Sequence, residues 1–424
     1  MAVAATTQYV TNGSLFDGTG ADLVPDAALV ITDGRIAAVG PRVAVPQPDG
    51  AEVIDAQGGY ILPGIIDAHV HLMFEAGDPM TAVVTPFSYN FYQAMTYMRR
   101  TVECGVTTVR DAAGTDAGTK KAVEDGLFLG PRMQISITAL STTGGHGDGW
   151  NLSGIDLPMM VDYPGMPNAI VDGEEAVRKK VREVLRAGAD VIKVCSTGGV
   201  MSPTDHPEFT QFTIEELKVM VQEAHFRKGI RVMSHAQGAE GIKNAIKAGI
   251  HSIEHGMFID DEALELMLEH GTFLVPTLVA PVGVIEQAAE TGRMPEYALR
   301  KAQETIDAHR ESIARAYKAG VRIAMGTDAG VVPHGTNLRE LGLMADLGMT
   351  PVDVLVASTK VAAECLGWED RVGTLEVGKF GDAIVTSVNP LEQIHDLADT
   401  ANVTVVIKGG EVVKDLRAAV PAIA

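Results

Sequence analysis

The chain has 424 residues, of which 46% are hydrophobic, and its formal net charge at pH 7 is −21. No apolar run reaches the roughly 18 residues that a membrane span needs, which argues against a helical membrane protein. The negative charge and the absence of a Lys/Arg cluster argue against nucleic acid or an anionic membrane as partner. The length favours two structural parts over one.

The chain begins with MAVAATTQYV, which lacks the basic and long apolar regions of a signal peptide. The three cysteines are widely spaced and form no CxxC pair, so thiols are expected where a secreted protein would have disulfides. These features together predict a cytoplasmic protein.

Short β-type segments, separated by Gly and Asp turns, occupy residues 8–60 and again residues 372–415. Since both ends of the chain carry such segments, we expect them to pair into one small β-sandwich domain. This domain would comprise residues 1–62 and 372–424.

Residues 63–371 alternate between strand-like and helix-like segments. The eight strand-like segments are GIIDAHVHL, VTTVRDA, RMQISITAL, DVIKVCS, IRVMSHA, HSIEHG, TFLVPTL and VRIAMGTDA. Helix-like segments such as EEAVRKKVREVLRAGA repeat apolar residues every three or four positions and end near glycine. The alternation predicts an α/β fold, a (β/α)8 TIM-like barrel with reactive groups at the carboxyl ends of its strands. Two long connections, 141–173 and about 281–320, are the expected lids.

His69 and His71 stand two residues apart at the end of the first predicted strand. Side chains in a strand alternate between its faces, so both imidazoles point the same way and could bind one cation. Such a pair can also be structural. Four other strand ends carry ligand-type residues, however: Lys193, His235, His255 and Asp328. Six such residues on five strands predict a metal site.

Lys193 is the unusual member of this set, because burying an ammonium group is costly and lowers its pKa. A neutral lysine amine can take up CO2 to form a carbamate, N6-carboxylysine, whose two oxygens could bridge two divalent metal ions. The alternative is a lysine that extends to the rim or pairs with an acid.

These motifs resemble the amidohydrolase superfamily, in its binuclear subtype with a carboxylated lysine. The resemblance covers almost the whole chain and is carried by PGIIDAHVH, VIKVCSTGGV, SHAQGAEGI, SIEHG and GTDAGVVPHG. Within the superfamily, the chain is similar to the imidazolonepropionase-like branch that includes Xaa-Pro dipeptidases and carboxypeptidase-type enzymes. Its SHAQG variant also resembles amidases that cleave N-acyl amino acids, among them those that release phenylalanine from ochratoxin A.

The resemblance implies two divalent metal ions, with zinc as the usual one. One ion would be held by His69, His71, Lys193 and Asp328, and the other by His235, His255 and the shared carbamate. A hydroxide that bridges the two ions would attack the amide carbonyl. Asp328 would take up its proton and pass it to the leaving amine. Relatives assemble as homo-oligomers, often octamers, so a homo-oligomer is expected.

Four further residues are candidates for substrate binding: His146, Arg110, Gln237 and His334. His146 lies in the Gly-rich segment TTGGHGDGWNL, where relatives place a histidine near the carbonyl or carboxylate of the substrate. Gln237 stands where relatives that are dipeptidases often carry a tyrosine that binds this carboxylate, so the dipeptidase assignment is weakened. Arg110 and His334 follow two of the strands, where a supporting role is an equal alternative.

The sequence therefore predicts a hydrolase that acts on a small-molecule or dipeptide substrate and releases a C-terminal amino acid. A cyclic-amide hydrolase similar to imidazolonepropionase is the alternative enzyme. A barrel that has lost catalysis and serves as a scaffold is a remote alternative, because all six ligand-type residues are present.

Overall fold

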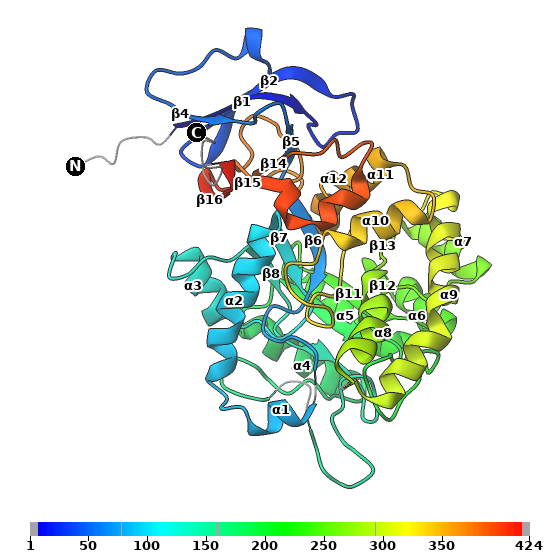
Figure 1. Cartoon of the computed structure of the whole chain (residues 1–424). Helices are drawn as coiled ribbons and strands as arrows, with labels where there is room; N and C mark the ends of the chain where they lie inside the picture. Colours follow the sequence, from blue (N-terminus) through cyan, green and yellow to red (C-terminus); the bar gives the residue numbers. More distant parts are fainter. Residues whose placement is uncertain (1–6, 78, 158–160, 293, 418–424) are drawn as a thin grey trace. The chain divides into compact units, whose positions relative to one another are not determined.

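The structure is a computed structural model that describes residues 7–77, 79–157, 161–292 and 294–417 (Figure 1). Its contacts divide the chain into two compact units. The first unit comprises Met1–Asp67, Met98–Thr108 and Gly335–Ala424, and the second comprises Ala68–Tyr97 and Val109–His334. The domain boundaries expected after residues 62 and 371 stay a prediction.

The first unit is built on an eight-stranded sheet. Its strands are β1 (Thr7–Leu15), β2 (Val24–Thr32), β3 (Arg35–Pro41), β4 (Glu52–Asp55), β5 (Tyr60–Pro63), β14 (Ala383–Thr386), β15 (Val403–Lys408) and β16 (Glu411–Asp415). Strand β5 pairs in parallel with β1 and antiparallel with β14, so strands from both ends of the chain belong to one sheet. Hydrogen bonds join all eight strands, with β5 paired along both of its edges, and the expected sandwich arrangement stays a prediction.

Apolar residues from both ends of the chain form the core of this sheet. Leu15, Ile61, Val385 and Ile407 are each at most 1% exposed and belong to one cluster. The unit also contains short helices: α10 (Arg339–Asp346), α11 (Pro351–Ala357), α12 (Lys360–Leu366), and the 3-10 helices η1 (Arg42–Ala44), η2 (Ile394–Ala398) and η3 (Thr400–Asn402).

The second unit consists mainly of parallel strands and helices that alternate along the chain (Figure 1). Its elements are α1 (Pro79–Val84), α3 (Ala117–Glu124), β8 (Arg132–Ile135), β9 (Ala139–Leu140), α4 (Glu174–Arg186), β10 (Val191–Cys195), α5 (Ile214–His225), β11 (Arg231–Ala236), α6 (Ala239–Ala248), β12 (Ser252–His255), α7 (Asp261–His270), β13 (Phe273–Val275), α8 (Val279–Thr291) and α9 (Glu296–Ala319). Three elements have residues in both units: β6 (Ile65–Val70), α2 (Tyr89–Glu103) and β7 (Val106–Asp111).

Seven of the eight strand-like segments contain strands at the expected places. Strands β9 to β13 form one parallel sheet, in the order β13-β12-β11-β10-β9, and β6, β7 and β8 form another. The third segment is split into β8 and β9, because Ile137 between them has a φ of 68° and interrupts the extended backbone.

The eighth segment, 321–329, forms isolated bridges and no continuous strand. The Ala324 amide donates to the Leu274 carbonyl beside β13, and the Asp328 amide donates to the His69 carbonyl beside β6. Asp328 has a φ of 62°, so the chain turns away from the strand direction there. Because this segment bonds to both sheets, the layout is compatible with a closed barrel.

The two long connections differ in structure. Between Leu140 and Glu174 the described residues form turns and isolated bridges, with no helix or strand. Helices α8 and α9 fill the second connection.

None of the helices in the described part of the chain combines the length and the apolar character needed to cross a membrane.

Candidate metal centre

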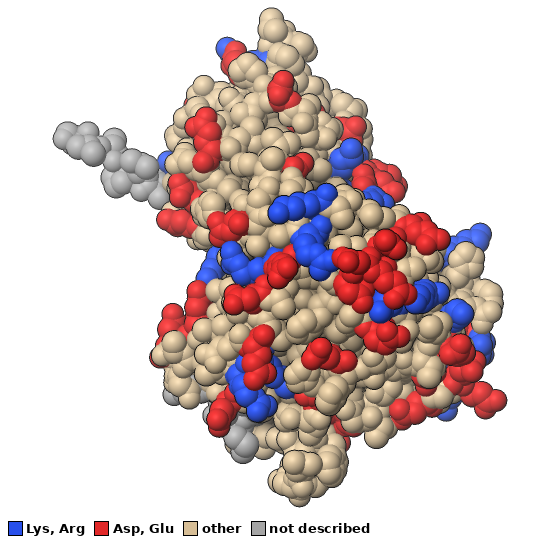
Figure 2. Space-filling view, turned by 90° about the vertical axis from the view of Figure 1, so that its right-hand side faces the viewer, with Lys and Arg blue, Asp and Glu red and all other residues tan. Residues whose placement is uncertain are grey.

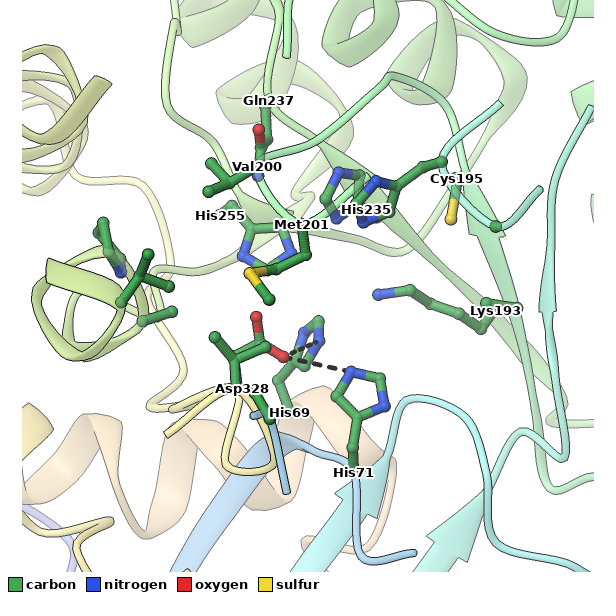
Figure 3. Close-up of a pocket in the computed structure, with 18 of the residues that line it drawn as sticks. His69, His71, Lys193, Cys195, Val200, Met201, His235, Gln237, His255 and Asp328 are labelled. Carbon is green, nitrogen blue, oxygen red and sulfur yellow. Dashed lines mark ion pairs between the residues drawn. The ribbon is translucent and has the colours of Figure 1, made fainter. Parts of the chain in front are cut away.

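The six ligand-type residues converge in the second unit (Figure 3). His69 lies on β6, Lys193 on β10, His235 on β11 and His255 at the end of β12, while His71 and Asp328 follow their strand segments. Parallel strands end at the same edge of a sheet, so residues distant in sequence meet there. All are buried except His71, which is partly buried.

The Asp328 carboxylate and the two imidazoles of the HxH pair are in direct contact. Oδ1 of Asp328 lies 3.2 Å from Nε2 of His71 and 3.5 Å from Nε2 of His69. His69, His255 and Asp328 each offer a ligand atom, and these atoms lie within 4.8 Å of one another. The ring centroids of His235 and His255 are 4.6 Å apart. Figure 3 shows the Lys193 side chain directed toward this group.

Hydrogen bonds on the outer side of the site orient three of the imidazoles. Nδ1 of His69 lies 2.7 Å from Oε2 of Glu254, Nδ1 of His71 lies 3.0 Å from the Ala113 carbonyl, and Nδ1 of His255 lies 2.7 Å from Oγ1 of Thr277. Histidines that bind metals are held in this way, with one nitrogen bonded to the protein and the other directed to the ion.

His235 is held by the opposite nitrogen. Its Nε2 lies 3.0 Å from the Gly198 carbonyl oxygen, so Nδ1 is the nitrogen that remains for an ion. The Gly198 carbonyl can only accept, so Nε2 carries the proton and Nδ1 carries the lone pair in the neutral ring.

The electrostatic environment favours the unprotonated state, which a metal ligand needs, for three of the imidazoles and for Lys193. Burial, together with the charge of Lys193 nearby, holds the pKa of His69, His235 and His255 well below the usual value. Burial also lowers the pKa of Lys193. These shifts favour neutral imidazoles and a neutral amine.

Burial alone would raise the pKa of Asp328, but the hydrogen bond to His71 and the basic nitrogens of His69, His71 and Lys193 nearby outweigh it. The pKa of Asp328 is therefore well below its usual value and the carboxylate is ionised at neutral pH. Buried imidazoles, one carboxylate and one lysine with a lowered pKa form a donor set that fits divalent metal ions.

The ligand-type residues line a cavity of about 230 Å³. The rest of its wall is mostly apolar, with contributions from Phe74, Val200, Met201, Met257, Val284 and Val331. His146 and Gln237 also line it, where the sequence placed candidates for substrate binding. Oε1 of Gln237 is buried and has no hydrogen-bond partner among the described residues, so a ligand in the cavity could supply one.

Arg110 and His334 are not among the residues that line this cavity. The Arg110 guanidinium donates to the Ala68 carbonyl, to Ser252 and to Glu254, while the His334 ring stacks on Tyr97. Their placement does not support the predicted role in substrate binding. Arg110 is held inside the unit by the acid that also holds His69.

The sequence interpretation missed Glu254, Thr277 and the residues that support His146. Glu254 precedes His255 on β12, and strict alternation would have turned it to the opposite face. His255 has a φ of 72°, however, so the strand rotates there. The available signal was an acid inside a short strand whose four residues are all buried.

Comparison with known proteins agrees with this geometry. The model of the amidohydrolase family matches residues 60–413. Ochratoxinase from Aspergillus niger is 36% identical over 416 residues, which cover 95% of this chain and 85% of that protein. Imidazolonepropionase from Rhizobium rhizogenes is 27% identical over 423 residues, covering 93% of this chain and 94% of its own.

Two solved structures resemble the whole chain. A Xaa-Pro dipeptidase with methionine bound in its active site has a TM-score of 0.88 and 35% identity, and the match covers 96% of this chain and 99% of that one. The structure of A. niger ochratoxinase has a TM-score of 0.83 and 34% identity, and the match covers 99% of this chain and 97% of that one.

Proposed function

Because this chain belongs to the amidohydrolase family, we propose that it is a metal-dependent hydrolase that cleaves an amide bond and releases a C-terminal amino acid. The observation that carries the proposal is the convergence of the six ligand-type residues in one cavity, whose remaining wall is mostly apolar. The substrate class that fits this cavity best is an N-acyl amino acid with an apolar acyl group, such as ochratoxin A, or a dipeptide.

In this proposal the second unit completes a (β/α)8 barrel around two divalent metal ions, with zinc as the expected metal. His69, His71, Lys193 and Asp328 would hold one ion, and His235, His255 and Lys193 the other, with Lys193 carboxylated. When bound, two such ions polarise a carbonyl and make water a nucleophile near neutral pH.

Asp328 is the residue that moves protons. Its carboxylate is ionised, and its Oδ1 faces the two imidazoles of the HxH pair. It can accept a proton from the attacking water and then donate this proton to the nitrogen of the leaving amino acid. One carboxyl group thus serves as base and then as acid.

The apolar wall and the polar side chains of Gln237 and His146 would bind different parts of the substrate. Phe74, Val200, Met201 and Val284 exclude water from the acyl part of the substrate. Gln237 and His146 offer hydrogen bonds to its carbonyl or carboxylate groups. The relatives named ochratoxinase and Xaa-Pro dipeptidase support an amide of an amino acid as the substrate class.

A small molecule, and not a nucleic acid, is the partner that we propose. On the face drawn in Figure 2, Lys and Arg side chains lie among Asp and Glu, as a net charge of −21 would suggest.

We also propose a homo-oligomer. Exposed apolar side chains on α2 and in the loop that follows β9 support it, since Tyr92 is 67%, Leu152 87% and Trp150 49% exposed. Light scattering after size-exclusion chromatography measures the assembly.

The test is the detection of free amino acids by mass spectrometry. Protein loaded with zinc is incubated with N-acyl-phenylalanines, Xaa-Pro and Xaa-Phe dipeptides, ochratoxin A and cyclic amides, with Asp328→Asn as the matched inactive variant. We expect release of a C-terminal amino acid by the wild type and not by the variant. Opening of a ring without amino acid release would favour the imidazolonepropionase-like alternative. No turnover of any substrate, although metal is bound, would favour a scaffold.

A further inference from the structure

His146 is held by a buried network that contributes nothing directly to the cavity wall. Its Nδ1 lies 2.8 Å from Oγ of Ser202 and 3.6 Å from Oδ2 of Asp205. Ser202 and Asp205 belong to the loop after β10 and are 2% and 8% exposed. Neither residue lines the cavity, whereas His146 does. They therefore reach a substrate only through His146.

The imidazole of His146 is also confined by its neighbours. It stacks on His235 with ring centroids 4.2 Å apart and an angle of 16° between the planes. A methyl group at Gly199 would overlap the ring, so the absence of a side chain there provides the space. Glycines stand on both sides of His146, at positions 144, 145, 147 and 149. Such a backbone fixes a side chain poorly, so the ring depends on its partners for its orientation.

Lys301 of α9 forms hydrogen bonds with three groups of the loop that carries Ser202 and Asp205. Its Nζ donates to the Gly199 carbonyl at 2.8 Å, to the Ser202 carbonyl at 2.8 Å and to Oδ1 of Asp205 at 3.2 Å. Lys301 is 2% exposed, and these three bonds use all three of its donors. A buried ammonium that is fully bonded in this way fixes the loop that carries both Ser202 and Asp205.

The direction of the hydrogen bonds follows from the chemistry of the groups. The Asp205 carboxylate can only accept, and the charges around it hold it ionised, since its pKa is lowered to about 2 despite burial. The single Ser202 hydroxyl proton has three possible acceptors in reach: Oδ1 of Asp205, Nδ1 of His146 at 2.8 Å and the Gly199 carbonyl at 3.3 Å. The Asp205 carboxylate is the only charged one and forms the shortest of the three contacts. The proton therefore goes to the carboxylate, and Ser202 Oγ accepts from Nδ1–H of His146.

We propose that Asp205, Ser202 and Lys301 are positioning residues that keep Nδ1 of His146 protonated and turned away from the cavity, so that Nε2 faces the substrate. Nε2 has no hydrogen-bond partner among the residues that the structure describes, so it is available to a ligand. The kinetic consequence rests on the proposed function, whereas the orientation of the ring does not.

A double-mutant cycle between Asp205 and His146 tests the kinetic part. Asp205→Asn keeps the shape of the side chain but can donate to Ser202, which would reverse the chain of bonds. We expect kcat/KM to fall about 10- to 100-fold, as for a misplaced binding group, and mostly through kcat. In the His146→Ala background the same substitution is expected to have almost no effect. Equal effects in both backgrounds would overturn the proposal.

Two further variants separate positioning from stability. Ser202→Ala removes the link and is expected to resemble Asp205→Asn, while Ser202→Thr keeps the hydroxyl and restores most of the activity. Lys301→Met is compared with Lys243→Met, because Lys243 also bonds to more than one oxygen, those of Asp260 and Glu262, and is not among the residues that line the cavity. Both lysine variants lose stability, and only Lys301→Met is expected to lower kcat/KM.

Diffraction provides a measurement that does not depend on activity. Neutron diffraction of the metal-loaded wild type is expected to show deuterium on Nδ1 of His146, and a bare Nδ1 would overturn the proposal. The X-ray structure of Asp205→Asn is expected to show the ring rotated or displaced. If the wild type cleaves none of the substrates but these structures agree, the proposed function fails and the positioning network stands. An unchanged ring in Asp205→Asn overturns the network itself.

Discussion

Nδ1 of His69 lies 2.7 Å from Oε2 of Glu254, and neither side chain is more than 1% exposed. The other carboxylate oxygen of Glu254 lies 2.9 Å from Nη2 of Arg110, which is equally buried. Glu254 thus joins a candidate metal ligand to a buried cation. Such an acid fixes the ring orientation of the histidine and increases its basicity.

Replacement of Glu254 by glutamine is expected to weaken metal binding by about 10- to 100-fold, because one bond that orients His69 is lost. Competition with a chromogenic chelator measures the affinity. The control is Glu223→Gln, since Glu223 is also a buried acid and bridges two arginines, Arg178 and Arg182, away from the cavity. An equal loss of affinity in both variants would contradict the role of Glu254.

The acid sensitivity of the fold depends in part on Asp205. Burial raises the pKa of this carboxyl, but the nearby imidazole of His146, the hydrogen bond from Ser202 and the charge of Lys301 bring it from 3.8 to about 2. A pKa that is lower in the folded state stabilises the protein above the unfolded value, and this contribution disappears as the pH falls through the folded value. The contribution is roughly 2 kcal/mol.

We therefore expect the difference in unfolding free energy between the wild type and Asp205→Asn to shrink as the pH falls from about 5 toward 2. Urea unfolding of both proteins at several pH values measures it. A difference that stays constant over this range would show that the charge of Asp205 does not contribute.

Gln237 is expected to bind the substrate through its side-chain amide, because Oε1 is buried in the cavity wall without a partner among the described residues. Gln237→Met keeps the length and removes the hydrogen bonds. We expect KM to rise about 10-fold with little change in kcat, as for binding that is equal in the ground and transition states. Because Oε1 can only accept, its partner would be an N–H of the substrate, and steady-state kinetics with an N-acyl amino acid and with its N-methylated amide indicates whether the amide N–H is the group bound. An unchanged KM for both substrates contradicts the assignment.

Ala280 of α8 lines the cavity, so a larger side chain there would fill the space for the acyl group. Ala280→Phe is expected to raise KM at least 10-fold for bulky acyl groups and much less for acetyl, because overlap with the larger group has to be relieved. Ala289→Phe, at an exposed position on the same helix, is the control. A uniform loss for all acyl groups would indicate damage to the fold.

The positions of the metal-ligand candidates were predictable because each stands at the end of an apolar strand-like segment, and parallel strands bring such ends together. His69, His255 and Asp328 illustrate this, since their ligand atoms meet although they lie up to 259 residues apart in the chain. The alternation of strands and helices likewise predicted strands in seven of the eight segments where the structure was expected to have them.

The residues that support the site were not predictable in the same way. Lys301 contacts Asp205 from a helix 96 residues further along the chain, and no local pattern encodes such a contact. The turn at Asp328 and the rotation at His255 depend on positive φ angles at non-glycine residues, which local preferences do not favour. For Arg110, at the end of β7, the sequence left substrate binding and a supporting role equally open, and its bond to Glu254 favours the supporting role.

We propose that Lys193, once carboxylated, would help to hold two metal ions in this cavity, and metal content measures this most directly. Wild type and Lys193→Ala are reconstituted with zinc in the presence of bicarbonate, freed of excess metal and analysed by inductively coupled plasma mass spectrometry. We expect two ions per chain in the wild type and at most one in the variant. A wild type that holds a single ion, or a variant that retains two, would contradict it.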